Sequence, residues 1–331
     1  MYFLERGFQW SKTLTTYEEA MNEFNKQQRQ PGQPELHSPD GISDSVSKQT
    51  NDNSSIYEYN NNHIDTRTPN DEKRGLISIF FFCTCAIILK GLLGTLYLAI
   101  KMIASGYRHD GEPLATTDYF FLIAFPLFWL VVLGIYLKYT LRFIRLESLT
   151  ARRIIVRFNR ITRKVYLLRP KHLGGIRIMD WDKTEIMIDK KMSELEGTGG
   201  FVILVWDKGD GVDLQGTPTD NIEVTFIGKP TRNASELLAF WEYIRRYMED
   251  GPAAAPAPKK LICKFPWPWL SLQAAWGLDT SFIRHRELWV FVLLNLLLWP
   301  VILIHATGHW LSLLLCYEPR FPKSIEDAGR R

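Results

Sequence analysis

The sequence predicts a membrane protein in which apolar helices are joined to a cytoplasmic α+β domain. Two observations lead to this fold class. Residues 75–100 and 119–137 together contain a single charged side chain, that of Lys90. In residues 154–227, apolar and polar side chains instead alternate with the period of two that is typical of β-strands, and one amphipathic helix follows. Such an uneven distribution of charge excludes a simple soluble globule.

The first region, residues 1–74, is expected to be a mostly disordered cytoplasmic tail. Residues 27–72 are rich in Gln, Asn, Ser, Asp and Pro, and they lack the apolar surface that offsets the entropy lost on ordering. Residues 1–26 hold more aromatic side chains and are a candidate for a short docking element. No cleavable signal peptide is expected, because the start has neither a basic nor an apolar region of the required kind.

Residues 75–140 are expected to hold two transmembrane helices, over 75–100 and 119–137. A helix rises 1.5 Å per residue, so about 20 apolar residues cross a hydrocarbon core of roughly 30 Å. Pro126 predicts a kink in the second helix, which membrane helices tolerate. The alternative, a pair of buried helices in a soluble core, is disfavoured because soluble helices seldom lack charge on every face.

A third transmembrane segment is expected within residues 288–316. The stretch 288–304 is apolar, and apolar character resumes at 311–316. Two arrangements stay open, one tilted span or a span followed by an interfacial turn, and residues 305–316 could span, re-enter or lie at the interface.

The distribution of Lys and Arg predicts the orientation. Residues 138–177 hold twelve Lys or Arg and one acid, whereas residues 101–118 hold two basic and three acidic residues. The central domain and the amino-terminal tail should therefore face the cytoplasm. One further span would place the carboxyl-terminal tail, residues 317–331, on the outside.

The cytoplasmic domain is expected over residues 141–250, as an antiparallel sheet of about seven strands followed by one helix. The helix, 234–250, places Leu237, Trp241, Ile244 and Met248 on one face, and Gly251 ends it. This order of elements is the layout of a pleckstrin-homology-like barrel. A plain α+β sandwich is the alternative.

Residues 251–287 are expected to form a Pro/Ala linker followed by a Trp-rich interfacial segment. Indole side chains favour the headgroup level of a bilayer, and basic side chains favour its anionic surface. The expected membrane-surface residues are Arg142, Arg145, Arg152, Arg153, Trp267, Trp269 and Trp276. For the tryptophans, an equal alternative is a loop that packs on the domain. For the arginines, the alternative is that they determine membrane topology and lie on solvated faces of strands.

Lys90 is a candidate partner-binding residue, because it lies near the middle of the first span. A cation at a helix centre costs about 2.5–3.5 kcal/mol on insertion scales, so it should face a bundle or a partner. No Asp or Glu lies in the three spans, which leaves Asn295, His305 or backbone carbonyls as the internal partners. The alternative is a shifted span from which Lys90 reaches the surface.

An acidic rim in the domain is a second candidate surface, suited to a basic partner. Its expected members are Asp180, Asp182, Asp207 and Asp210, although solvated turns explain them equally well. Nucleic acid is not expected as a partner, because residues 141–250 hold nineteen basic and sixteen acidic residues and no recognition motif.

Catalysis, cofactors and a metal site are not expected. The sequence has no nucleophile elbow, phosphate-binding loop or metalloprotease motif. Four Cys without a Cys-x-x-Cys pair make neither a disulfide framework nor a zinc site. His305 and His309 share a helical face, but no third ligand is near them in the sequence, and interfacial histidines are the preferred interpretation.

Three stretches resemble a known family: FNRITRKVYLLRP (158–170), IMDWDK (178–183) and FWEYIRRYMEDGP (240–252). They are similar to stretches of an uncharacterised family of proteobacterial inner-membrane proteins, and the resemblance covers about residues 75–310. Members tend to be encoded beside type VI secretion and polymorphic-toxin genes. The resemblance implies an inner-membrane immunity protein that neutralises a cognate secreted toxin. The alternative is a membrane-tethered adaptor or lipid-surface sensor that assists secretion.

Overall fold

The structure is a computed structural model that describes Glu18 and residues 41–69, 74–188, 200–231, 234–276 and 289–329, with only the backbone at 234, 291, 292 and 295. The described chain divides into two compact units. Unit 1 takes in residues up to Lys73, Ala151–Pro266 and Tyr317–Arg331, and unit 2 takes in Arg74–Thr150 and Trp267–Cys316. Each unit is therefore assembled from segments far apart in the sequence.

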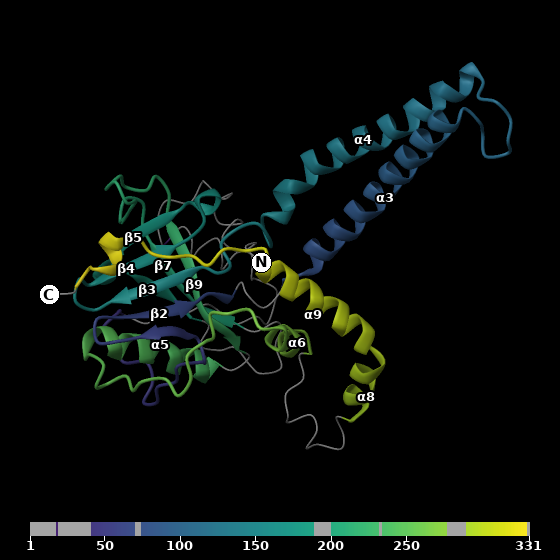
Figure 1. The fold of residues 1–331 in the computed structure, drawn as a ribbon. Helices are drawn as coiled ribbons and strands as arrows, with labels where there is room; N and C mark the ends of the chain where they lie inside the picture. The colour runs from purple at the N-terminus through teal and green to yellow at the C-terminus, as the bar shows by residue number, and fades with distance from the viewer. Residues whose placement is uncertain are drawn as a thin grey trace. The chain divides into compact units, whose positions relative to one another are not determined.

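Unit 1 is an α+β unit built on two antiparallel sheets (Figure 1). The larger sheet has six strands in the order β1-β2-β3-β4-β5-β8, and the smaller has the order β6-β7-β9. The strands are β1 (Ile56–Tyr59), β2 (His63–Arg67), β3 (Ile155–Asn159), β4 (Lys164–Leu168), β5 (Ile176–Asp180), β6 (Glu185–Met187), β7 (Gly200–Trp206), β8 (Gly211–Val212) and β9 (Glu223–Thr231). Two short 3-10 helices, η2 (Lys171–Leu173) and η3 (Trp181–Lys183), flank β5.

The strand-rich domain expected from the sequence is present, and its boundaries are wider than predicted. The expected tail is wrong for residues 56–67, because β1 and β2 belong to the six-stranded sheet and β2 pairs along its whole length with β3. The described strands form two open sheets. A closed pleckstrin-homology-like barrel stays a prediction.

The main core of unit 1 lies where both sheets meet helix α5 (Ala234–Glu249). Alternate side chains of the strands point into it, among them Val156 of β3 and Leu204 of β7. Leu237, Trp241 and Ile244 are fully buried on α5, as the spacing in the sequence predicts. This core includes Ile56 and Ile64, which explains why the segment before the first apolar helix is folded.

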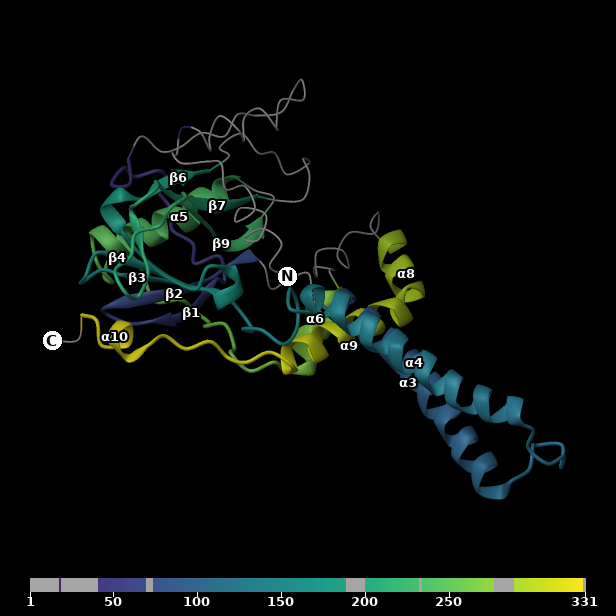
Figure 2. The same ribbon diagram turned by 90° about the horizontal axis from the view of Figure 1, so that it is seen from above.

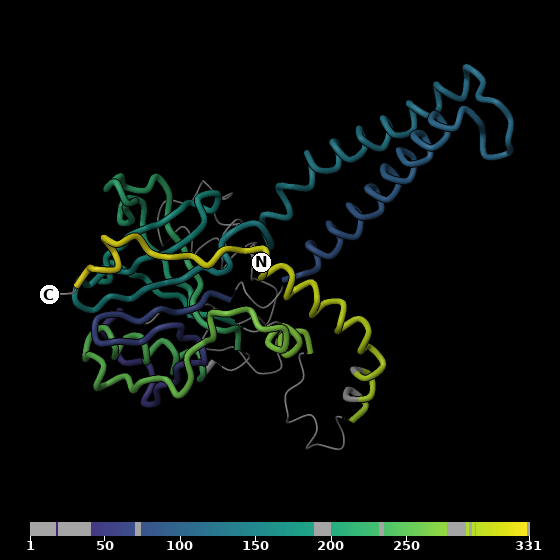
Figure 3. Tube along the Cα trace, in the orientation of Figure 1, coloured from purple at the N-terminus to yellow at the C-terminus, as the bar shows by residue number. Residues whose placement is uncertain are grey.

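A second, smaller cluster covers the opposite face of the six-stranded sheet. Phe321 and Ile325 from the carboxyl-terminal segment pack on Ile155 and Tyr166, and helix α10 (Lys323–Glu326) lies in that segment. Figure 3 traces this segment in yellow across the sheet. The backbone N–H of Ile262 also donates to Ile56 O at 2.8 Å. The expected linker and tail are thus structural parts of unit 1.

Unit 2 consists of helices. The two longest, α3 (Leu76–Ser105) and α4 (Thr116–Ile144), lie side by side as an antiparallel hairpin in both views (Figures 1 and 2). They are the two helices in the described chain that are long and apolar enough to cross a membrane. Both extend past the predicted spans 75–100 and 119–137, and Pro126 lies inside α4.

The third apolar segment, expected within 288–316 as one tilted span or as a span followed by an interfacial turn, consists of two helices. They are α8 (Trp289–Leu297) and α9 (Trp299–Leu314), which are separated at Leu298, and Pro300 is the second residue of α9. A proline at the start of a helix fits, because its missing N–H needs no partner there. Helix α6 (Pro268–Trp276) packs against α9, and it contains part of the predicted Trp-rich segment.

Candidate functional site

The surface of the α3–α4 hairpin is covered by large apolar side chains exposed to the surroundings. Phe80 is 78% exposed on α3 and Phe120 is 67% exposed on α4. Soluble proteins rarely leave contiguous apolar surface of this extent, and such surface marks contact with a membrane or a partner. The hairpin is therefore a candidate surface for contact with a membrane or a partner.

Close packing joins the two helices at mid-length. A Cβ placed on Gly91 of α3 would lie 2.5 Å from the indole ring of Trp129 on α4, so only glycine admits the ring there. Nearer to the start of α3, Phe81 stacks on Tyr136, whose hydroxyl donates a hydrogen bond to Phe81 O at 3.0 Å. These contacts fix which residues of the two helices lie level with each other.

Lys90 precedes Gly91 and is exposed on α3. Within the described side chains it makes no hydrogen bond or ion pair. The side chain of its expected polar companion, Asn295, lies outside the described residues. The structure therefore places Lys90 at the middle of a long apolar helix, one residue before the glycine that contacts Trp129.

A buried polar cluster holds the start of α3 to the end of α4 and to α9. The carboxylate of Glu147 accepts hydrogen bonds from the backbone N–H of Ser78 at 2.8 Å and from its hydroxyl at 2.9 Å. Ser312 on α9 donates to Glu147 O at 2.9 Å. A carboxylate beside a helix amino terminus satisfies N–H groups that the helix itself leaves free. We interpret Glu147 as a structural residue.

Close approach also characterises the crossing of α3 and α9. A Cβ on Gly308 would overlap Ile79 and approach Gly75 O, and one on Gly75 would overlap the backbone of His309. His309 Nδ1 lies 2.8 Å from the hydroxyl of Ser271, and His305 Nε2 lies 3.1 Å from Arg74 O. The two histidines thus contact different segments.

Basic and aromatic side chains gather at two places in unit 2. Arg142 and Arg145 are exposed at the carboxyl end of α4. Trp267 and Trp269 stack with ring centroids 4.5 Å apart, and both are exposed. Trp276 is half-buried against Trp299. The exposed side chains are suited to a lipid headgroup region.

Arg152 and Arg153, predicted at the membrane surface, have internal roles instead. Both guanidinium groups form ion pairs with Glu318, at 3.1 and 3.2 Å. Arg153 is 5% exposed, donates to Lys264 O at 2.6 Å and lies over the ring of Tyr57. Its charge is thus paired inside unit 1, and the expected headgroup contact of Arg153 stays a prediction.

The predicted acidic rim is largely paired with basic side chains of the same unit. Asp182 pairs with Arg163, which also binds Glu249 at 3.0 Å. The other rim contacts are Asp210 with Lys183 at 2.6 Å and Asp180 with Lys164 at 4.0 Å. Asp207 is half-buried. Burial raises the pKa of the Glu185 carboxyl, and the negative charge of Asp207 raises it further. The rim therefore presents alternating charges.

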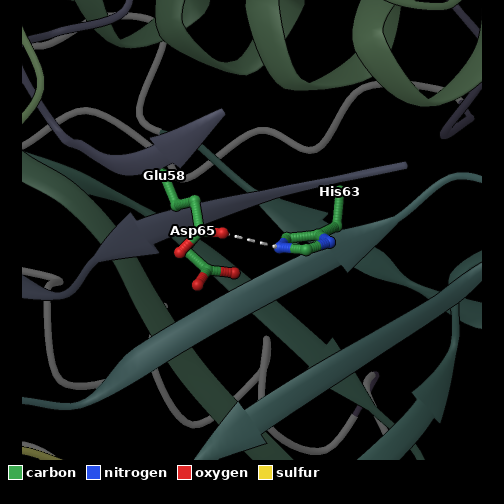
Figure 4. A group of neighbouring side chains, drawn as sticks. All are labelled: Glu58, His63 and Asp65. Atoms are coloured by element: carbon green, nitrogen blue, oxygen red, sulfur yellow. Dashed lines mark ion pairs between the residues drawn. The ribbon is translucent and has the colours of Figure 1, made fainter. Parts of the chain in front are cut away.

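Glu58, His63 and Asp65 form the one cluster of potential metal ligands in the described chain (Figure 4). His63 Nε2 lies 3.6 Å from Glu58 Oε1, the contact drawn in the figure. Burial is the main cause that lowers the pKa of His63, against the opposing effect of Asp65. For Glu58, burial raises the pKa, but Lys264, His63 and Arg157 together leave that pKa below its usual value.

The partner of Asp65 decides the character of this cluster. Arg157 donates to both carboxylate oxygens, at 2.7 and 2.8 Å, and both side chains are buried. The other face of its guanidinium lies over the ring of Phe321. A divalent cation bound to Asp65 would meet this fixed positive charge. The residues therefore suit an ion-pair network that joins β2, β3 and the carboxyl-terminal segment.

The fold and these sites define an α+β protein that carries a hairpin of two apolar helices of membrane-spanning length. The chain belongs to the Family of unknown function (DUF6708), which matches residues 136–331. The match begins inside α4, so β1, β2 and α3 precede it. No curated protein and no solved structure matches the chain.

Several structural residues of both units were missed by sequence reasoning. Asp65 and Arg157 are 92 positions apart, and Glu147 and Ser78 are 69 apart. The one local signal was the isolation of Glu147 among twelve basic residues.

Proposed function

We propose that this protein is a membrane-anchored binding protein in which α3 and α4 cross the bilayer and unit 1 binds a partner from the cytoplasm. The observation that carries the proposal is the apolar, exposed surface of the hairpin, whereas most large apolar side chains of unit 1 are buried in its own core. The helices are 30 and 29 residues long, which exceeds the roughly 20 residues that a span requires.

The strand pairing of unit 1 supports a hairpin that crosses twice. β2 precedes α3, β3 follows α4, and these strands are paired over five positions. Both ends of the hairpin therefore return to the same folded unit, and they must lie on the same side of a bilayer. An even number of crossings is required, and two helices supply it.

The same reasoning changes the expectation for the third apolar segment. Residues 262–264 contact β1, and Tyr317 pairs with the stretch just before β3, where its O accepts from Arg152 N at 2.8 Å. Residues 267–316 thus begin and end beside unit 1. A single crossing by α8 and α9 would separate the two ends, so we propose that this segment enters the membrane from one side only. The carboxyl terminus then stays with unit 1.

Charge supports a cytoplasmic location for that side. Lys138, Arg142 and Arg145 are exposed at the end of α4 that leads into unit 1. The loop at the other end of the hairpin contains Asp110 and Glu112 and one arginine, Arg108, which is paired with Asp118. Basic residues are retained on the cytoplasmic side of membranes.

The proposed partner is a cognate secreted toxin, and the proposed role is that of a non-enzymatic immunity protein of the bacterial inner membrane. The support for the toxin is the sequence resemblance of residues 158–170, 178–183 and 240–252. A protein anchored at the membrane is well situated to occlude a toxin that acts at or enters through it.

Co-expression of the full chain with each toxin gene encoded beside it tests this role. We expect growth to be rescued from one toxin, and we expect no rescue with a chain that lacks residues 75–140. Failure to rescue cells from any of these toxins would contradict the immunity function. A variant with Lys229→Ala, an exposed residue outside the three resembling stretches, controls for general effects of substitution.

A second candidate function, a lipid-surface adaptor, is favoured by the exposed stack of Trp267 and Trp269. It predicts that Trp267→Ala with Trp269→Ala alters tryptophan fluorescence in anionic vesicles and impairs secretion while toxin rescue persists. Equal secretion by the variant and the unaltered chain would remove this alternative.

A further inference from the structure

The depth of Lys90 in a bilayer follows from the contact of Gly91 with Trp129, independently of where α3 itself begins and ends. Trp129 lies eleven residues after Asp118 and nine before Lys138, the charged residues that bound the apolar part of α4. At 1.5 Å per residue, it is about 16 Å and about 14 Å from them. Lys90, level with Trp129, is therefore near the centre of the apolar layer from either side.

From this depth the side chain of Lys90 does not reach the aqueous surface. Its four-carbon stem extends about 6 Å, less than half of the distance to either charged boundary. A shifted span does not change this result, because α3 and α4 would have to shift together. The ammonium consequently stays within the apolar layer. Its charge is unpaired there unless a polar group of another helix lies beside it.

Lys90 lies on the face of α3 opposite to the seam with α4. Phe81 and Ile88 are buried along that seam, and successive helix residues turn by about 100°, which places residue 90 on the far side. Ile87, Leu93 and Tyr97 share the face of Lys90 and are each more than 60% exposed. A Cβ on Gly94, one turn beyond Lys90, would meet no atom within 4 Å. The lysine is thus at the centre of an open apolar face, beside a glycine that leaves the backbone accessible.

We infer that this face binds a transmembrane helix of another protein, and that the helix carries an Asp or Glu at mid-membrane depth to pair with Lys90. The inference rests on the proposed membrane crossing of α3. Ionisable residues inside membranes pair with one another or with backbone groups, and a carboxylate is the complement of an ammonium. A small residue beside it allows close helix approach.

A second copy of this chain does not supply the required carboxylate. Residues 76–105 contain no acid, and the sole acid in 116–144, Asp118, is at the start of α4 and is paired with Arg108 at 2.6 Å. Two copies joined through this face would place one Lys90 against the other. Charge complementarity therefore selects a partner that differs from this chain.

The first test uses a probe of known sequence. A single-span Leu/Ala helix with Asp at its centre, and the same helix with Leu there, are each reconstituted with the full-length protein in neutral vesicles, and association is measured by energy transfer. We expect the Asp helix to associate about tenfold more tightly than the Leu helix. Lys90→Leu should abolish the difference, whereas Lys90→Arg should retain it. Lys101→Leu, which removes a charge from the same face at the helix end, is the matched control. Equal association of the two helices overturns the inference.

The second test asks whether such a partner exists in host membranes. A photo-crosslinking amino acid at Leu93 of the full chain should capture a protein whose spans include a central carboxylate, and the same group at the buried Ala99 should not. Lys90→Asp should abolish capture, and changing the partner's carboxylate to Lys should restore it. Capture of a second copy, of a partner without that carboxylate, or of no protein would each overturn the inference. If a membrane-impermeant reagent labels Ile87→Cys in sealed vesicles, the proposed crossing itself fails, which is a different result.

Discussion

Arg157 binds both carboxylate oxygens of Asp65, at 2.7 and 2.8 Å, across the pair of strands β2 and β3. One residue precedes the helical hairpin and the other follows it. Their contact is therefore a direct link between the two chain segments that enter and leave unit 2. Phe321 covers the guanidinium, so the carboxyl-terminal segment closes over the same ion pair.

Removing one member of this pair should destabilise unit 1 strongly. For Arg157→Ala we expect a loss of about 3–5 kcal/mol in the free energy of unfolding, because Asp65 is left as a buried charge without its partner. Denaturant unfolding of the full chain in detergent, followed by tryptophan fluorescence, measures it. The control is Lys164→Ala, since the Lys164 side chain is 43% exposed and 4.0 Å from Asp180, and its loss should be below about 1 kcal/mol. Equal losses in both variants would contradict the structure.

Acid should weaken the attachment of residues 45–46 to α5. Burial raises the pKa of Glu242, but bonds from Arg245, Arg246, Val46 and Ser45 outweigh this and lower the pKa to about 2. Because the folded pKa lies below the unfolded value of about 4.5, the contribution to stability is complete above that value and is lost as the pH falls toward 2. Unfolding midpoints measured from pH 6 to 3 should fall less steeply in Glu242→Gln than in the unaltered chain. Parallel curves would disprove the assignment.

Gly91 and Gly94 form a matched pair on α3. Gly91→Ala should cost about 1–3 kcal/mol, because the added methyl group lies against the indole of Trp129 and forces the helices apart. Gly94→Ala should be neutral or slightly stabilising, since its methyl group meets no atom within 4 Å and alanine favours helix. Thermal unfolding of both variants in the same detergent compares them. The packing described here is wrong if Gly94→Ala is the more damaging change.

The cluster around Glu147 makes a prediction about the start of α3. Glu147→Ala should cost about 1–3 kcal/mol, because the buried N–H and hydroxyl of Ser78 lose their acceptor. Glu147→Gln should be much milder, since the amide oxygen accepts the same two bonds. Hydrogen exchange at the first turn of α3 should rise in the alanine variant, and an unchanged exchange rate in that variant would argue against this role for Glu147.

Local patterns in the sequence were sufficient to predict α3, α4, α5 and the strands from Ile155 to Thr231. In each case the period of apolar residues is continuous within one element. The pairing of Ile64 with Phe158 was beyond such reasoning, because a polar segment of 41–69 gains its stability from a sheet formed by residues more than 90 positions away. Composition predicted disorder there, and tertiary contacts overcame it.

Some residues of the candidate sites could be identified from the local sequence, whereas the role of others depends on tertiary contacts. Lys90 was identified from the sequence because a charge in an apolar helix is anomalous wherever it lies. Arg153 and Asp182 were assigned to surfaces from their charge alone, yet both have partners of opposite charge in unit 1. Which charges are paired depends on strand register and on the course of the carboxyl-terminal segment, and neither is visible in a local pattern.

Cysteine labelling from each side of the membrane decides whether the hairpin crosses it. Single cysteines at Gly111 and at Ala328, in a chain whose four native cysteines are replaced, are exposed to a membrane-impermeant maleimide in sealed inner-membrane vesicles of known orientation. We predict that the cysteine at 328 reacts from the cytoplasmic face and the cysteine at 111 from the opposite face. If both react from the same face, or if the chain is found in the soluble fraction, the hairpin does not cross the membrane.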